Sequence, residues 1–154
     1  TRALNRSGAK ALKQTKRTLR QQTKIKAGTI NAGVKGRRAN YRNLTYEIVG
    51  RGEYISLKEF GAKQFSYGVR ANVWEGSKRY PHTFIWAGTP GSGKPVGGGH
   101  VFSRVAGSKS TPIEKKWGPS IPVEMLREPA IGVFEAAGED VKVEAMRQIE
   151  QVLP

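Results

Sequence analysis

The segment that decides the fold is TRALNRSGAKALKQTKRTLRQQTK, residues 1–24. When its residues are turned by about 100° each, as in an α-helix, all of its basic side chains fall within about 120° of arc. These are Arg2, Arg6, Lys10, Lys13, Lys16, Arg17, Arg20 and Lys24. Small and apolar positions fall on the opposite side: Leu4, Gly8, Ala11, Leu12, Thr15 and Leu19. The spacing predicts an amphipathic helix, in which Gly8 costs about 1 kcal/mol but permits close packing.

The positive charge of the chain is concentrated in this region. The 154 residues have a formal net charge of +15, and residues 1–46 hold thirteen Lys and Arg without one acid. The rest of the chain has a net charge of only +2, and residues 124–154 have a net charge of −4. This asymmetry indicates a polyanionic partner or an acidic protein surface, which the acidic segment offsets in part within the subunit or from a neighbour.

The sequence beyond the basic segment predicts an α+β fold. A short second helix is expected at 28–34, followed by a loop through Asn43. Five runs then have a period of two: LTYEIVG (44–50), YISLKEF (54–60), GVRANVWE (68–75), HTFIWAG (82–88) and HVFSRVA (100–106). No helical pattern separates them, so we expect a small antiparallel sheet of about five short strands. From Pro129 to Leu153, apolar residues recur every fourth position and predict a C-terminal amphipathic helix.

Three segments follow from this pattern. Residues 1–43 form the basic helical segment, residues 44–126 the β body, and residues 127–154 a helix that packs on the body. The body contains a Gly-rich hairpin loop at 87–99 and a Pro-rich loop at 112–122, PIEKKWGPSIP. We interpret the second loop as extended and anchored by Trp117, either in the core or at a subunit contact. The candidate residues for an oligomer or partner interface are Trp117, Pro119, Ile121 and Pro122.

The loop AGTPGSGKPVGGGHVF, residues 87–102, contains the G-x-x-x-x-G-K pattern of a phosphate-binding loop at 88–94. That motif needs a Ser or Thr for magnesium and a helix that begins at once. Here Pro95 takes the position of the hydroxyl residue, and three glycines lead into a β-type run. The pattern favours a hairpin tip, and we expect no nucleotide and no other cofactor.

The residue inventory also argues against catalysis. The chain has no cysteine, two histidines (His82 and His100) and a single aspartate, Asp140. No spacing typical of metal ligands or of a Ser-His-Asp arrangement is present. No apolar run reaches the length of a membrane span. We therefore expect a protein that is not an enzyme, with no catalytic residue, no metal ion and no membrane partner.

The cationic face of residues 1–24 is the candidate contact surface for DNA or for an acidic partner. A solvated helix face usually mixes both signs of charge, whereas this one has eight positive charges. No aromatic residue precedes Tyr41, so base stacking is not built into the segment. The form of nucleic-acid binding that it permits is sequence-independent contact with phosphates.

Several motifs in order resemble the minor tail protein Z family of tailed bacteriophages and prophages. They are TRALNRSGAKA, ISLKEFGAKQ, GVRANVW, FIWAG, GHVFSRV and PIEKKWGPSIPVEM. The resemblance extends from Thr1 to about Leu126, and its most specific parts are ISLKEFGA, GHVFSRV and PIEKKWGPSIP taken together.

This resemblance implies a structural virion protein that completes the tail and joins it to the head, assembled in the bacterial cytoplasm. The expected partners are copies of the chain itself in a homo-oligomeric ring, a hexamer by analogy, the neighbouring head-closure and tail-terminator proteins, and phage DNA that passes through without sequence-specific contact. The main alternative is a stand-alone, sequence-independent nucleic-acid-binding protein. A third hypothesis, an enzyme that uses the Gly-rich loop, predicts thermal stabilisation by a nucleotide with magnesium.

Overall fold

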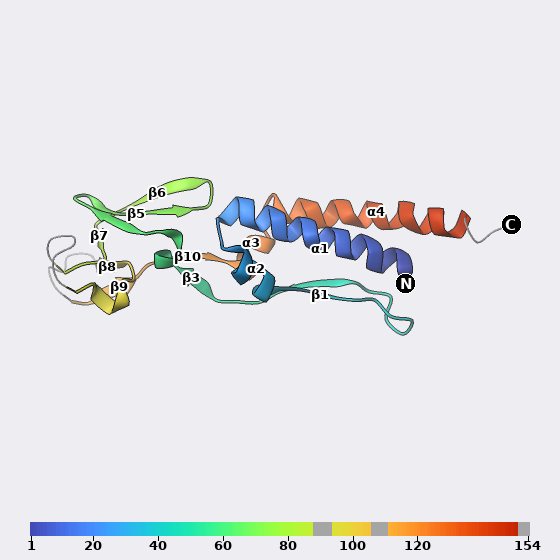
Figure 1. Ribbon diagram of the computed structural model, residues 1–154, viewed down its shortest axis with the longest axis horizontal. Coiled ribbons are helices and arrows are strands. Elements are labelled where there is room, and N and C mark those ends of the chain that lie inside the picture. Colours follow the sequence, from blue (N-terminus) through green and yellow to red (C-terminus); the bar gives the residue numbers. More distant parts are fainter. Residues whose placement is uncertain (88–93, 106–110, 151–154) are drawn as a thin grey trace. The chain divides into compact units, whose positions relative to one another are not determined.

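The computed structural model describes residues 1–87, 94–105 and 111–150. Its helices and short antiparallel strands confirm the α+β class (Figure 1). Contacts group the chain into two compact units, of which the first comprises residues 1–22, 26–52 and 121–154 and the second residues 23–25 and 53–120. The C-terminal helix thus groups with the basic helix and with residues 44–52 of the predicted body, whereas residues 53–120 of that body form the other unit.

The first unit is built on two long helices, α1 (Arg2–Thr23) and α4 (Ala130–Glu150), which lie alongside each other in Figure 1. Both helices were predicted from their periodicity. The shorter helices are α2 (Ala27–Gly33), which confirms the helix expected at 28–34, and α3 (Ile121–Met125). Strands β1 (Val34–Arg37) and β2 (Glu47–Gly50) pair antiparallel, with Val34 opposite Gly50.

The first half of the buried face of α1 is made of small residues, which lets other elements approach its backbone closely. Ala3, Ser7 and Ala11 are buried along it, and Leu19 is fully buried. The ring of Tyr46 lies against Gly8, at a position that a Cβ atom on Gly8 would occupy, and the Tyr46 hydroxyl lies against Gly36 of β1. Gly8 therefore provides the close packing that the sequence predicts.

A buried carboxylate joins α1 to α3 in this unit. The Glu124 side chain is 3% exposed, and it accepts hydrogen bonds from Gln22 at 3.0 Å and from Arg127 at 3.1 Å. The guanidinium of Arg127 neutralises the buried charge, which would otherwise be costly. Glu124 is therefore a structural ion-pair partner.

The described residues of the second unit form three small antiparallel sheets. Strand β3 (Tyr54–Ser56) pairs with β10 (Trp117–Ser120). Strands β4 (Lys63–Phe65), β5 (Gly68–Val73) and β6 (Gly76–Pro81) form the second sheet in that order. Strands β7 (Thr83–Phe84), β8 (Phe102–Arg104) and β9 (Ile113–Lys115) form the third. Two 3₁₀ helices complete the unit, η1 (Leu57–Phe60) and η2 (Val96–Gly98).

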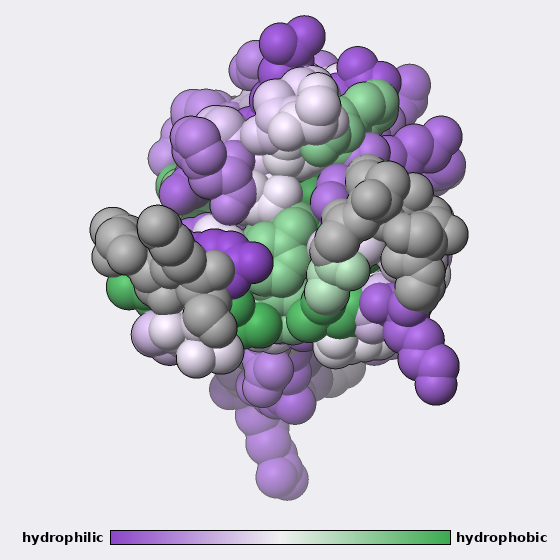
Figure 2. All heavy atoms as spheres, turned by 90° about the vertical axis from the view of Figure 1, so that its left-hand side faces the viewer, coloured by the Kyte–Doolittle hydropathy of each residue, from purple (hydrophilic) through white to green (hydrophobic). Residues whose placement is uncertain are grey.

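The core of this unit lies beneath the inner face of β5. Val69, Ala71 and Val73 are buried on that face, and η1 packs near β5 with Leu57 and Phe60 buried. The alternation in GVRANVW, which puts Arg70 and Asn72 on the other face, is confirmed. Figure 2 shows hydrophobic side chains gathered in the middle of one face of the unit, with hydrophilic ones around them.

In place of the single predicted sheet of about five strands, the described residues form four small sheets. YISLKEF is not one strand, because the chain turns into η1 after Ser56, whose Oγ accepts a hydrogen bond from the Lys58 amide at 3.4 Å. HTFIWAG contributes only the two residues of β7, preceded by His82 in the left-handed region at φ 58°. Five strands were missed: β1, β4, β6, β9 and β10.

The prediction of an extended loop at 112–122 is also wrong. The segment forms β9, β10 and the start of α3. Pro119 is tolerated in β10 because, among the described residues, that strand pairs with β3 alone, so its other edge needs no amide donor. Pro122 lies in the first turn of α3, where a missing N–H is no loss. The prolines therefore sit at positions where regular structure accepts them.

Part of the sequence interpretation lies outside the described residues. This holds for most of the G-x-x-x-x-G-K motif at 88–94, for much of the Gly-rich loop at 87–99, and for Leu153. Within the described part of the chain, no helix is both long and apolar enough to cross a membrane.

Candidate functional site

The basic side chains predicted on one face of the N-terminal helix are mostly exposed on α1. This is true of Arg2, Arg6, Lys10, Lys13, Arg17 and Arg20, whereas Lys16 is half-buried. The predicted place of Lys24 on the helical face is wrong, because α1 ends at Thr23 and Lys24 follows it in the left-handed region at φ 62°. Lys24 belongs to the second unit and is not part of the helical face.

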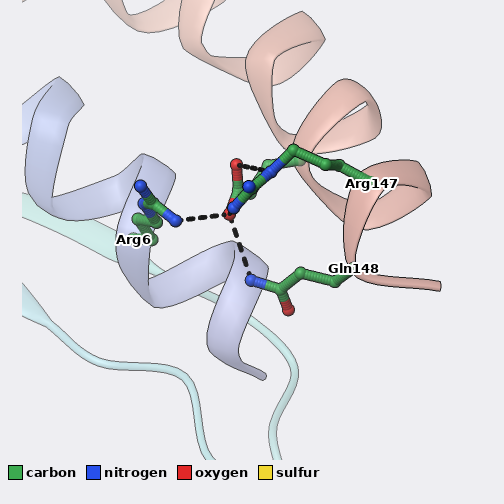
Figure 3. A network of polar contacts seen from close by, with 4 residues as sticks. Arg6, Arg147 and Gln148 are labelled. Atoms are coloured by element: carbon green, nitrogen blue, oxygen red, sulfur yellow. Dashed lines mark hydrogen bonds and ion pairs between the residues drawn. The ribbon is translucent and has the colours of Figure 1, made fainter. Parts of the chain in front are cut away.

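One end of this face is matched by an acidic side chain of α4 (Figure 3). Arg6 donates to Glu144 at 3.1 Å, and Arg147 and Gln148 donate to the same carboxylate at 3.0 and 3.1 Å. The Arg147 hydrogen bond is the main cause that lowers the pKa of Glu144 to about 2, with Gln148 and the charge of Arg6 adding to it. The same contact raises the pKa of Arg147.

Further along, α1 and α4 form the two walls of an open groove of about 940 Å³. Lys10, Lys13 and Arg17 line the α1 wall, and the opposite wall includes Asp140 of α4 and Glu128, which precedes that helix. The acidic segment therefore opposes part of the cationic face within one subunit. A smaller hollow of about 190 Å³, lined by Lys16, Arg17 and Arg20 together with α2, has no acid in its lining.

A second cationic surface, which the sequence interpretation missed, lies on the outer face of the sheet β4–β5–β6. The strand register puts Lys63 opposite Arg70, and Arg70 opposite Arg79. All three side chains are exposed. We call this set the cross-strand row. The alternation in GVRANVW placed Arg70 outward, but the other two members depend on pairing between strands.

Aromatic rings accompany the cross-strand row. The rings of Phe65 and Tyr67 stack with centroids 5.5 Å apart and planes 2° apart. The Arg70 guanidinium lies 4.8 Å from the centroid of Phe65, and that of Arg79 lies 5.2 Å from the centroid of Tyr67. Each arginine is thus held over a ring by a cation–π contact.

The four candidate interface residues near Trp117 separate into two groups. Pro119 and Ile121 are buried inside the chain, which excludes them as contact surface and corrects the prediction. Trp117 is 47% exposed, with Lys115 Nζ 4.0 Å from its ring centroid, and Pro122 is half-buried. Trp117 is therefore not an anchor in the core, and the Lys115 ammonium lies over its exposed ring.

A Ser–His pair in the second unit resembles catalytic machinery at first sight. Ser56 Oγ lies 2.7 Å from His100 Nδ1, and Lys115 Nζ lies 3.5 Å from His100 Nε2. Burial and the charges of Lys115 and Lys58 lower the pKa of His100, against a smaller effect of Glu59. An ammonium beside Nε2 requires that nitrogen to accept, so the proton is on Nδ1 and is donated to Ser56. His100 in this state cannot take a proton from Ser56.

The described residues contain no group of three His, Cys, Asp or Glu side chains placed to hold a metal ion. No protein-family model, no curated protein and no solved structure matches this chain. The resemblance to the tail-protein family therefore stays an expectation from the motifs, and the surfaces carry the argument about function.

The last feature is hydrophobic surface in the first unit. Along α4, Phe134, Val143 and Met146 are 52%, 70% and 64% exposed, and Ile149 is also exposed. Phe134 borders an open apolar hollow of about 240 Å³, which Leu4 and Tyr46 also line. Large hydrophobic side chains of this number along one helix are typical of a surface that another protein covers.

Proposed function

We propose that this chain is a structural virion protein of a tailed phage, a tail-completion or neck component that assembles into a ring at the head–tail junction around the DNA channel. The motifs at TRALNRSGAKA, ISLKEFGA, GHVFSRV and PIEKKWGPSIP support the family, and a six-fold ring follows by analogy. The protein acts as an assembly component and not as a catalyst.

The observation that carries the proposal is the exposed hydrophobic surface of α4. Val143 and Met146 lie on the side of the helix away from the residues that pack inward, such as Val141. They are three positions apart in the sequence, so they lie on one face of the helix. A protein that stays monomeric gains nothing from such a face, whereas a ring subunit buries it against its neighbour.

The cationic face of α1 supports the same proposal. Acids of α4 oppose part of it, and the hollow next to α2 has none. Cations that remain open suit either an acidic surface on an adjacent ring or the phosphates of DNA in transit. Non-specific contact is the form a conduit needs, because DNA must slide through it.

The experiment is assembly of the purified chain, followed by sedimentation velocity and negative-stain microscopy. The variant Val143→Ser/Met146→Ser is expected to stay monomeric with an unchanged far-UV spectrum. The matched control Glu135→Ser/Lys142→Ser lies on the same helix, keeps the net charge, and should form rings as the parent does. If the parent chain forms no oligomer alone or with phage tails, the ring proposal fails.

A phage that lacks the protein provides the biological test. Free filled heads beside free tails in the lysate are the expected result for a component that joins the two. Particles that look normal and infect normally would contradict the proposed role.

A stand-alone nucleic-acid-binding protein is the second candidate, and the cross-strand row favours it. That candidate predicts micromolar or tighter binding to DNA by the monomer, with affinity that falls steeply as salt rises.

A further inference from the structure

The cross-strand row puts three like charges side by side without an acid to balance them. Adjacent strands in a sheet are about 4.8 Å apart, so Lys63, Arg70 and Arg79 cross the sheet within about 10 Å. Like charges directly opposite each other destabilise a sheet. None of the ion pairs among the described residues involves any of the three. An external anion would remove this repulsion.

The rings of Phe65 and Tyr67 fix the two arginines for such a contact. A guanidinium held over an aromatic ring loses little freedom when it binds, and the N–H groups along its edge stay available. Arginine edges of this kind bind phosphate with two parallel hydrogen bonds. The stacked pair therefore preorganises Arg70 and Arg79 as donors.

Neutral donors lie next to the charged ones. Asn72 and Ser77 are opposite each other, two residues along from Arg70 and Arg79, and so on the same face of the sheet. Both side chains are exposed. Contacts to phosphates and sugars commonly combine Arg and Lys with such Asn and Ser groups.

We propose that the outer face of β4–β5–β6 binds the phosphate backbone of nucleic acid without regard to sequence, through Lys63, Arg70 and Arg79. A line of evenly repeated charge suits a nucleic-acid strand, whose phosphates repeat at a regular spacing. Tyr67, 37% exposed, adds a ring at the edge of the site where a base or sugar can rest. The inference assigns a site to the second candidate function, and it needs neither a ring nor a phage particle.

The test is fluorescence anisotropy of a short labelled DNA duplex with the full chain over a series of salt concentrations. In Lys63→Gln/Arg70→Gln/Arg79→Gln, the dissociation constant at low salt should rise by about tenfold or more, and the salt slope should fall by about 2 to 3. The control Lys35→Gln/Arg38→Gln/Arg51→Gln removes the same one Lys and two Arg from exposed positions of the first unit. Its slope should change by less than 1.

If the triple variant and the control lost DNA affinity equally, the effect would be one of net charge alone, and the proposed site would be wrong. Lys63→Gln alone tests the site without risk to the packing of the sheet, because Lys63 makes none of its cation–π contacts, which involve Arg70, Lys78 and Arg79. It should lower the slope by about 1 and leave the thermal melt cooperative. An unchanged slope in this folded variant would also overturn the site.

Competition distinguishes the class of partner. Polyglutamate at the same charge concentration should displace the labelled duplex much less well than unlabelled duplex does. Equal displacement would assign the face to an acidic protein and overturn the proposal. Sedimentation of the same samples separates the two proposals, because the triple variant is expected to lose DNA affinity while its assembly is unchanged.

Discussion

The two cationic faces of this protein differ in what stands opposite the charge. On α1, Arg6 reaches Glu144, and Lys10 shares a groove with Asp140. On the sheet β4–β5–β6, Arg70 and Arg79 lie over rings and beside each other, and no acid pairs with them among the described residues. The longer run of charge in the sequence is thus the better compensated one. A count of charges in the sequence would have identified α1 as the less compensated face, whereas the structure assigns that property to the sheet β4–β5–β6.

The largest expected effect tests the packing behind the α1 face. In Gly8→Ala, the new methyl group would overlap the Tyr46 ring, whose hydroxyl end already lies against Gly36, so the free energy of unfolding should fall by about 1 to 3 kcal/mol. Gly138→Ala in α4 is the matched control, because nothing lies within 4 Å of its Cβ position. That variant should gain up to about 1 kcal/mol from helix propensity. Urea denaturation followed by circular dichroism measures both, and the same sign for the two would contradict this account of Gly8.

A smaller effect tests the difference in charge directly. Lys63→Gln removes a like charge from the cross-strand row and should raise the free energy of unfolding by about 0.5 kcal/mol at low salt. Arg6→Gln removes an attractive partner from Glu144 and should lower it. Thermal melts at low and high salt measure the two shifts, which should shrink as salt screens them. If Lys63→Gln instead lowers the free energy of unfolding, repulsion between Lys63 and Arg70 is not a net cost to the fold.

The smallest effect concerns pH. Because the folded chain lowers the pKa of Glu144 from 4.5 to about 2, the contribution of this carboxylate is complete above pH 4.5 and is lost as the pH falls toward 2. The urea midpoint of the parent chain should therefore fall more over this range than that of Glu144→Gln. Parallel curves for the two proteins would remove Glu144 as a cause.

The local parts of the fold could be predicted from the sequence, and the parts set by distant contacts could not. A helical wheel uses only neighbouring residues, so α1, its basic face and the close approach at Gly8 were all expected. The same helical wheel included Lys24, which lies one residue beyond the end of α1. The position of a helix end depends on the backbone conformation there, which the wheel does not contain. The cross-strand row needs the register of three strands, which no spacing in the sequence states. Pro119 was taken as a loop signal, although a strand with one free edge accepts it.

The hydrogen bond between Gln22 and Glu124 joins residues 102 positions apart in the chain. At ribosomal speeds of about 5–20 residues per second, Glu124 is made roughly 5 to 20 seconds after Gln22. The second unit, contained in residues 23–25 and 53–120, is complete before α3 and α4 exist. During synthesis, α1 is therefore present without α3 and α4 while the second unit is made. The unit whose synthesis begins first is thus the one whose sequence is completed last.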